Sequence, residues 1–198
     1  MCNLYKMTAT VDEMRRVFGA FEGDTSNLPP FDNIYPGYQA PVLRRREDGG
    51  LTLELMTWGL PGPAAAGNRP VTNVRNLESP FWRSSLHNPR WRCLIPVTRF
   101  CEWTEEPDRG TGRKSKVWFG RADQPVFAFA GVWRPADSGS LMAFLTCEAN
   151  SVVGAVHPKA MPVILEPGSF EVWLSSERVD ACALARPFPD ERMIQLAD

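Results

Sequence analysis

The chain has 198 residues and a formal net charge of −1, so its overall charge does not mark a nucleic-acid-binding protein, and any such site must be a local basic patch. Its 18 prolines and 15 glycines favour short elements and many turns over long helices. No apolar run reaches the length of a membrane span, and the N-terminus lacks the layout of a signal peptide. We therefore expect one β-rich α+β domain over residues 1–198, in the cytoplasm and monomeric.

The first part of the chain is predicted to form a strand, a helix and a hairpin. Thr10 and Glu13 have the spacing of a capping box, and apolar residues with helical spacing follow them. The segment 22–37 is rich in Pro, Asp, Asn and Gly, which favours irregular structure. Strands are expected at 2–7, 38–45 and 51–58, and the last two form a hairpin that turns at Asp48-Gly49-Gly50.

The second part is predicted to consist mainly of strands. Loop 59–76 is long for a compact domain and rich in Gly and Pro, so we expect it to form a wall of a functional site. Helices are expected near 78–86 and at 167–175, where Pro167 opens the second one. Strands are expected at 92–97, 99–104, 115–120, 125–133, 141–147 and 161–165.

Five cysteines without CxxC spacing favour reduced thiols over a disulfide framework or a zinc site. Cys2 stands apart because removal of the initiator Met1 would leave one residue with both a free α-amine and a thiol. An α-amine with a pKa of about 8 forms a Schiff base with an aldehyde, and the thiol can then close a thiazolidine ring. The alternative is a tolerated cysteine at a frayed terminus. The other four are expected to be small buried residues: Cys93, Cys101, Cys147 and Cys182.

Other polar residues are also candidates for chemistry. His157 precedes Pro158, and a loop histidine suits proton transfer, although it could equally be bonded to backbone. Glu102 lies in an otherwise apolar strand, where it either faces solvent or points into a cavity that raises its pKa into the acid/base range. Asn73 and Arg75 could supply an oriented amide and a phosphate-binding guanidinium, and Asn73 could also be a turn former.

Short motifs along the chain together resemble the SRAP family, the SOS-response-associated peptidases, also described as abasic site processing proteins. The resemblance runs from residue 2 to about residue 175, and the shared order of the motifs carries it, because each motif alone is weak. The motifs are Met1-Cys2, Trp58-Gly59-Leu60, Asn73-Val74-Arg75, Arg92-Cys93-Leu94-Ile95-Pro96, Cys101-Glu102-Trp103, Ala130-Gly131-Val132-Trp133, Thr146 with Ala149-Asn150, and His157 ahead of Met161-Pro162-Val163-Ile164-Leu165.

The resemblance implies a single SRAP-type domain with a twisted, barrel-like antiparallel sheet, a few short helices and a basic groove for single-stranded DNA. It also implies a thiazolidine crosslink between Cys2 and the opened sugar of an abasic site, which shields the lesion, with no metal or organic cofactor. By motif, Asn73 would orient the sugar, Glu102 would be the acid/base carboxylate, and His157 would assist ring opening and reversal. The DNA contacts implied are Arg75, Trp58 and Thr146. The protein would then associate with the nucleoid when bound.

The chain departs from the family pattern in three places. Asn3 and Leu4 replace the usual Gly-Arg after the cysteine, and Lys6 could restore the lost charge. Cys101 stands where an aromatic residue often precedes Glu-Trp. The common His-x-Arg-Met-Pro is one residue longer here, which weakens Lys159 as a candidate DNA contact.

Two other functions stay open at this point. An N-terminal-nucleophile hydrolase or cysteine peptidase could use Cys2, His157 and Asn73, the residue types of Cys-His-Asn proteases. Turnover of a peptide in trans, without a DNA adduct, would favour it. A non-catalytic module that binds single strands is the other alternative, and blocking the terminal amine would leave its function unchanged.

Overall fold

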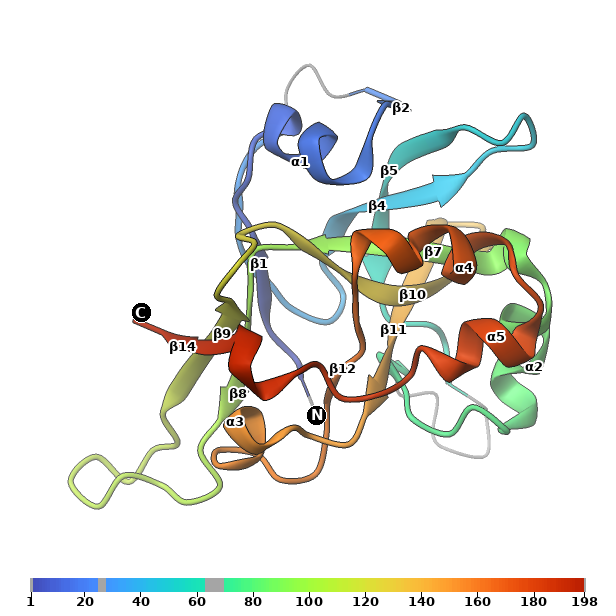
Figure 1. The fold of residues 1–198 in the computed structure, drawn as a ribbon. Coiled ribbons are helices and arrows are strands. Elements are labelled where there is room, and N and C mark those ends of the chain that lie inside the picture. Colours follow the sequence, from blue (N-terminus) through green and yellow to red (C-terminus); the bar gives the residue numbers. More distant parts are fainter. Residues whose placement is uncertain (1, 25–27, 63–69, 198) are drawn as a thin grey trace.

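The computed structural model describes residues 2–24, 28–62 and 70–197, which form two β-sheets flanked by short helices (Figure 1). In the larger sheet, the strands in spatial order are β12 (Met161–Pro162), β11 (Gly139–Cys147), β10 (Phe127–Ala136), β7 (Arg92–Val97), β4 (Gln39–Arg45), β5 (Leu51–Trp58) and β2 (Phe21–Glu22). Two short strands join it from the side: β13 (Ile164–Leu165) pairs with β10, and β6 (Asn73–Val74) pairs with β11.

The larger sheet closes into a ring because β11 pairs with β5 as well as with β10. In this parallel pairing, Leu141 lies opposite Thr57 and Met142 lies opposite Trp58. The other pairs of the ring, β11 with β10, β10 with β7, β7 with β4, and β4 with β5, are antiparallel. The expected β-rich α+β fold with a barrel-like, mainly antiparallel core is therefore confirmed.

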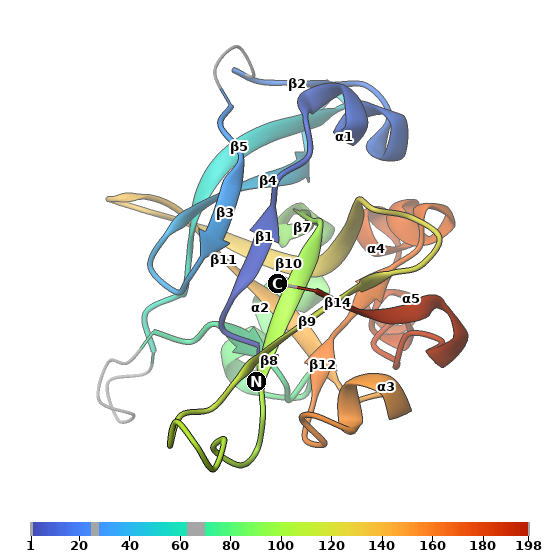
Figure 2. The same ribbon diagram turned by 90° about the vertical axis from the view of Figure 1, so that its left-hand side faces the viewer.

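The smaller sheet is antiparallel and contains both an early and a late segment of the chain. Its order is β14 (Met193–Leu196), β9 (Lys116–Arg121), β8 (Arg99–Trp103), β1 (Tyr5–Met7) and β3 (Phe31–Ile34). Figure 2 shows β3, β1 and β8 side by side. The N-terminal residues are thus held between two partner strands.

The helices are short, as the many prolines and glycines predict. The capping box forms: the Thr10 N–H donates to Glu13 Oε2 (2.7 Å), and the Glu13 N–H donates to Thr10 Oγ1 (3.3 Å). The α-helices are α1 (Val11–Phe18), α2 (Pro80–His87), α3 (Ser151–Gly154), α4 (Phe170–Ser175) and α5 (Arg178–Ala183). The 3-10 helices in the described part of the chain are η2 (Pro89–Trp91), η3 (Pro167–Ser169) and η4 (Asp190–Arg192). Among the described residues, no helix is long and apolar enough to cross a membrane.

Several of the predicted elements differ from the structure. The segment 22–37 is not irregular throughout, because Phe31–Ile34 pairs with β1. The predicted strand 161–165 is split at Val163, whose N–H donates to the Leu145 carbonyl and whose carbonyl accepts from the Ala130 N–H. Met1 and residues 63–69 of the predicted long loop lie outside the described residues.

A cluster of buried aromatic side chains joins the two sheets. Tyr5 of β1 packs edge-on against Trp58 of β5, with ring centroids 5.3 Å apart, and Trp58 packs against Phe144 of β11 at 5.0 Å. Phe129 of β10 lies 4.9 Å from Phe144. Such rings bury large apolar areas, so this cluster fixes β1, and with it the residues before β1, against the barrel.

Candidate functional site

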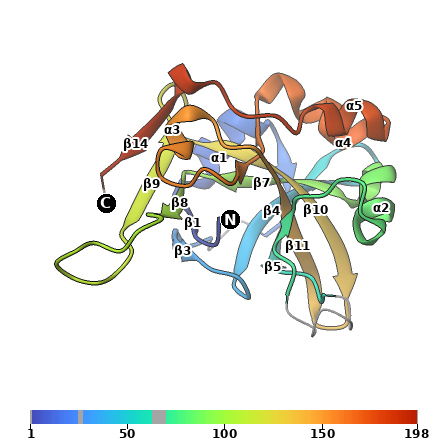
Figure 3. The same ribbon diagram turned by 90° about the horizontal axis from the view of Figure 1, so that it is seen from below.

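The pairing of β1 with β8 positions the first residues of the chain. Tyr5 lies opposite Phe100, and the Cys101 N–H donates to the Leu4 carbonyl (2.9 Å). One residue further on, the Trp103 Nε1–H donates to Asn3 Oδ1 (3.0 Å). The chain therefore follows β8 back to Cys2, and from below, the N-terminus lies between β8 and β11 (Figure 3).

Cys2 is buried, with 1% of its surface exposed. Its carbonyl accepts a hydrogen bond from Asn73 Nδ2 (3.3 Å), and its Sγ lies 3.5 Å from the Leu4 carbonyl. Burial raises the pKa of the thiol well above its ordinary value, and the nearby charge of Glu102 raises it further. The thiol is therefore protonated at neutral pH.

Asn73 reaches Cys2 from a strand rather than from a turn. In the parallel pairing of β6 with β11, Asn73 lies opposite Phe144. Its Nδ2 also donates to Thr72 Oγ1 (2.8 Å). The Oδ1 atom is buried and has no hydrogen-bond partner among the described residues. Because an unpaired buried acceptor is costly, this oxygen is suited to receive a hydrogen bond from a bound molecule.

Glu102 faces the interior, so the solvent-facing alternative does not apply. It is 1% exposed and lies two residues from Phe100, on the same face of β8, where Phe100 packs against Phe119 and Phe129. Burial raises the pKa of Glu102 to about 7, and the positive charge of the amino terminus opposes this rise. A carboxyl group with that pKa can donate or accept a proton near neutral pH.

His157 follows α3 and is partly exposed. Its N–H donates to the Val153 carbonyl (2.8 Å). Burial lowers the pKa of the imidazole, the positive charges of the amino terminus and Lys159 lower it further, and Glu105 opposes them. The neutral imidazole is thus favoured at pH 7.

Arg75 and Thr146 line one pocket of about 310 Å³. The Arg75 Nη1 atom donates to the Cys147 carbonyl (2.6 Å), which fixes the guanidinium while the residue stays exposed. Thr146 is 3% exposed, and its hydroxyl has no hydrogen-bond partner within the described part of the chain. Arg75 and Thr146 therefore lie together at one pocket.

Trp58 differs from the expected arrangement because its side chain is fully buried. Its Nε1–H donates to the Thr72 carbonyl (2.9 Å), and its ring packs against Tyr5 and Phe144. A base cannot stack on this ring in the present structure. What Trp58 does here is hold the backbone that leads into Asn73.

A model of the family described as SOS response associated peptidase (SRAP) matches residues 1–196. The chain belongs to the SRAP family. Membership supports an enzyme-like function connected with DNA and the SOS response. The SRAP match reaches beyond residue 175, where the sequence resemblance ended, and includes β14, which pairs with β9.

Solved structures share the fold of this SRAP chain. A protein from Bordetella bronchiseptica is 24% identical with a TM-score of 0.77, and 98% of each chain is covered. A protein from Bacteroides thetaiotaomicron is 22% identical with a TM-score of 0.78, covering 98% of this chain and 90% of the other. A phage-related protein from Bordetella bronchiseptica is 18% identical with a TM-score of 0.77, covering 98% and 93%. A search of curated proteins found no match.

Two departures from the SRAP pattern turn out to be neighbours. Leu4 and Cys101 are both fully buried and pack with Trp118 in a small apolar cluster. Leu4 thus occupies an apolar contact in place of the charged residue usual at this position. Lys6 lies on the same side, with Nζ 4.6 Å from the centroid of the Trp118 ring.

One motif residue proves to have a structural role that the sequence analysis did not assign. Asn150 is the N-cap of α3: its Oδ1 accepts from the Val153 N–H (2.9 Å), and its Nδ2 donates to the Phe188 carbonyl (2.9 Å). It therefore sets the turn from which His157 emerges. An Asn before a short helix was the available signal. Over the described residues, no three His, Cys, Asp or Glu side chains are grouped as for a metal ion.

Proposed function

We propose that this protein captures abasic sites in single-stranded DNA covalently, through Cys2 at the N-terminus that removal of Met1 creates. The observation that carries the proposal is the position of Cys2, held by the Asn73 side chain and next to a buried carboxyl group with a pKa of about 7. A residue with an amine and a thiol, beside an oriented amide and a proton donor, is suited to reaction with an aldehyde.

The raised pKa of the Cys2 thiol decides the order of the steps. Because the thiol is protonated near pH 7, the α-amine attacks the aldehyde carbon of the opened sugar first. The hydroxyl of the resulting adduct takes a proton and leaves as water, which gives an imine. The sulfur then bonds to the imine carbon, and the thiol proton ends on the nitrogen. The thiazolidine forms without any oxidant or reductant.

Glu102 and His157 are suited to different proton transfers in this sequence. Glu102 keeps its proton up to about pH 7, so it serves as the acid that assists the departure of water. His157, whose pKa is lowered, is neutral at the same pH and can accept a proton. Two groups whose surroundings shift their pKa values in opposite directions divide the acid and base roles.

The same geometry counts against the peptidase alternative. In a Cys-His-Asn protease the asparagine orients the histidine, and the cysteine is activated by a lowered pKa. Here the Asn73 amide contacts the Cys2 carbonyl, and burial raises the pKa of the thiol. Single-stranded DNA as the partner is supported by family membership and by the exposed Arg75 guanidinium beside Thr146.

The proposal is tested by mixing the mature protein with a single-stranded oligonucleotide that carries one abasic site. We expect an adduct that survives denaturation, with the mass of the protein lacking Met1 plus the oligonucleotide minus one water. Cys2→Ala should give no stable adduct. Cys2→Ser is the control of matched shape. Like Cys2→Ala it keeps the amine, so either variant should give only a Schiff base that borohydride traps. A stable adduct from Cys2→Ala, or from protein that retains Met1, would show that the proposed chemistry is wrong.

A further inference from the structure

We propose that Arg186 forms, together with Arg75, a binding site for one backbone phosphate of the DNA strand that carries the lesion. This inference rests on the proposed function. The two arginines come from distant parts of the chain and line one pocket of about 310 Å³, together with Thr146, Cys147, Leu77 and Pro187. The segment that contains Arg186 lies between α5 and η4 (Figure 1).

The charges of this pocket are not neutralised within the protein. Arg75 and Arg186 have no carboxylate within ion-pair distance in the described ranges, although Glu148 lies at the same pocket. Other arginines behave differently: Arg178 pairs with Glu78, and Arg192 pairs with Asp123 and Glu166. Two uncompensated guanidiniums in one concave site create a local positive potential that attracts an anion.

The strand register places the pocket next to the reacting residues. Asn73 pairs with Phe144 and Val74 with Leu145, and directly after this pairing Arg75 Nη1 donates to the Cys147 carbonyl at the end of β11. Asn73 donates to the Cys2 carbonyl, and Arg75 lies two residues further along the same segment, so the segment that contacts Cys2 leads directly to the pocket.

The chemistry of the lining favours a phosphodiester. Guanidinium groups bind phosphate oxygens with paired N–H donors, and Arg75 is already oriented by its bond to the Cys147 carbonyl. The negative charge of Glu148, which also lines the pocket, disfavours ligands of higher negative charge. A phosphate with one negative charge next to the abasic sugar meets both conditions. Because the pocket lies on one side of Cys2, it should hold a phosphate on one side of the lesion only.

The test measures non-covalent binding of an undamaged single-stranded oligonucleotide by fluorescence anisotropy at several salt concentrations. Arg186→Ala should weaken binding about fivefold to tenfold at low salt and should reduce the slope of log K against log salt by about 0.7, the loss of one phosphate contact. Arg186→Lys should keep the slope. The matched control is Arg16→Ala, an exposed arginine on α1 at the opposite end of the molecule (Figure 1).

A second measurement uses abasic oligonucleotides shortened on one side of the lesion at a time. Shortening on one side should remove the difference in affinity between wild type and Arg186→Ala, and shortening on the other side should leave it. If Arg186→Ala binds like Arg16→Ala, or binds more weakly with an unchanged salt slope, the phosphate site is wrong while crosslinking can stand. If no adduct forms but Arg186→Ala lowers both affinity and slope, the proposed function fails and the phosphate site holds.

Discussion

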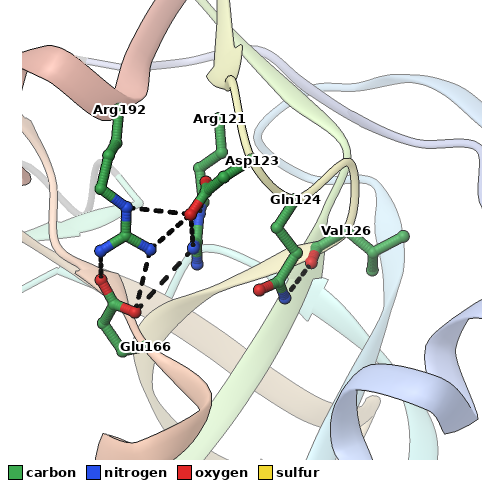
Figure 4. Close-up of polar contacts among 6 residues, drawn as sticks. All are labelled: Arg121, Asp123, Gln124, Val126, Glu166 and Arg192. Carbon is green, nitrogen blue, oxygen red and sulfur yellow. Dashed lines mark hydrogen bonds and ion pairs between the residues drawn. The ribbon is translucent and has the colours of Figure 1, made fainter.

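Glu102 and Asp123 lie on adjacent parts of one antiparallel sheet, since Glu102 is in β8 and Asp123 follows β9, yet their surroundings are opposite in kind. Asp123 accepts hydrogen bonds from Arg121 Nε (3.0 Å) and Nη2 (2.9 Å) and from Arg192 Nε (2.9 Å) (Figure 4). The hydrogen bonds from Arg121 have the largest effect and those from Arg192 a smaller one. Together they hold the pKa of Asp123 well below its usual range. Burial instead raises the pKa of Glu102 to about 7.

The ion-pair cluster around Asp123 serves to join segments. Glu166, just after β13, also accepts from Arg192 Nη2 (3.1 Å), and the Arg121 side chain is only 2% exposed. The cluster thereby ties β9, the end of β13 and the η4 turn before β14 to one another (Figure 4). A carboxylate paired in this way stays ionised and stabilises the fold, whereas one that is buried beside an amine can exchange its proton. Asp123 therefore stabilises the fold, whereas Glu102 is suited to proton transfer.

The largest effect is expected when the reactive carboxyl group is removed. Glu102→Gln keeps the shape of the side chain but cannot transfer a proton, so the rate of crosslinking should fall about 100-fold or more. Single-turnover measurements on denaturing gels give this rate. Binding of undamaged single-stranded DNA should not change, and a rate within threefold of wild type would mean that Glu102 does not act as the acid.

Breaking the structural cluster should affect stability and leave the chemistry alone. Asp123→Asn removes the charge that two arginines share, one of them buried, and should cost about 1–2 kcal/mol of unfolding free energy, the modest figure reflecting the partial exposure of Asp123. Urea denaturation at pH 7 measures it, with the exposed turn residue Asp137→Asn as the control.

The pH dependence of this effect has a definite sign. The pKa of Asp123 is lowered in the folded protein, so its stabilising contribution is present above the unfolded-state pKa of about 4 and is lost as the pH falls through the folded value. The difference between wild type and Asp123→Asn should therefore shrink in acid. A difference that grows below pH 4 would contradict the role of the ion pairs.

The pH profile of crosslinking should show the Glu102 acid directly. The amine must be neutral, with a pKa of about 8, and Glu102 must be protonated, with a pKa of about 7. The rate should follow a bell with its maximum near pH 7.5 and should fall roughly fivefold by pH 9. In Glu102→Gln the alkaline fall should disappear, since only the amine titrates. An unchanged alkaline limb in that variant would assign it to another group.

The smallest expected effect is an increase in the stability of the folded protein in Glu102→Gln, the same variant that should lose crosslinking activity. The pKa of Glu102 is raised in the folded protein, so ionisation of this group destabilises the fold at pH 7 and above. Below pH 4 the carboxyl group is protonated in the folded and the unfolded state, and the destabilisation is absent. Glu102→Gln should therefore be more stable than wild type by on the order of 1 kcal/mol at pH 8 and equally stable at pH 4. Thermal unfolding at the two pH values tests this, and a variant less stable at pH 8 would show that ionised Glu102 is well compensated.

The barrel could be predicted in large part because its strands carry their own signals. Residues 92–97 form β7 as predicted, and the hairpin of β4 and β5 turns at Asp48-Gly49-Gly50. The short strands β6 and β14 carry no such local signal and could not be predicted from the sequence. The two-residue strand β6 exists only because β11 supplies its partner, and β14 because β9 does, so tertiary pairing overrides weak local preference.

Features of the candidate site that depend on tertiary packing could not be predicted from the sequence either. Residue type and family resemblance predicted Cys2, Asn73, Glu102 and His157, and the structure places the first three in or near contact. Burial was not visible in the sequence: Trp58 was expected near unstacked bases but is enclosed by Tyr5 and Phe144. Arg186 carried no signal at all, because only the folding of the C-terminal segment against β11 brings it to Arg75.

The strand β11 fixes both ends of the segment between β5 and β6. One edge of β11 pairs with the end of β5 at Met142 and, two residues later, with the start of β6 at Phe144. Leu60 and Val71 also pair with each other, which closes the base of the excursion. Both ends of this segment are therefore held by hydrogen bonds to β11. A peptide inserted into this excursion should therefore leave the amide of Asn73 in place.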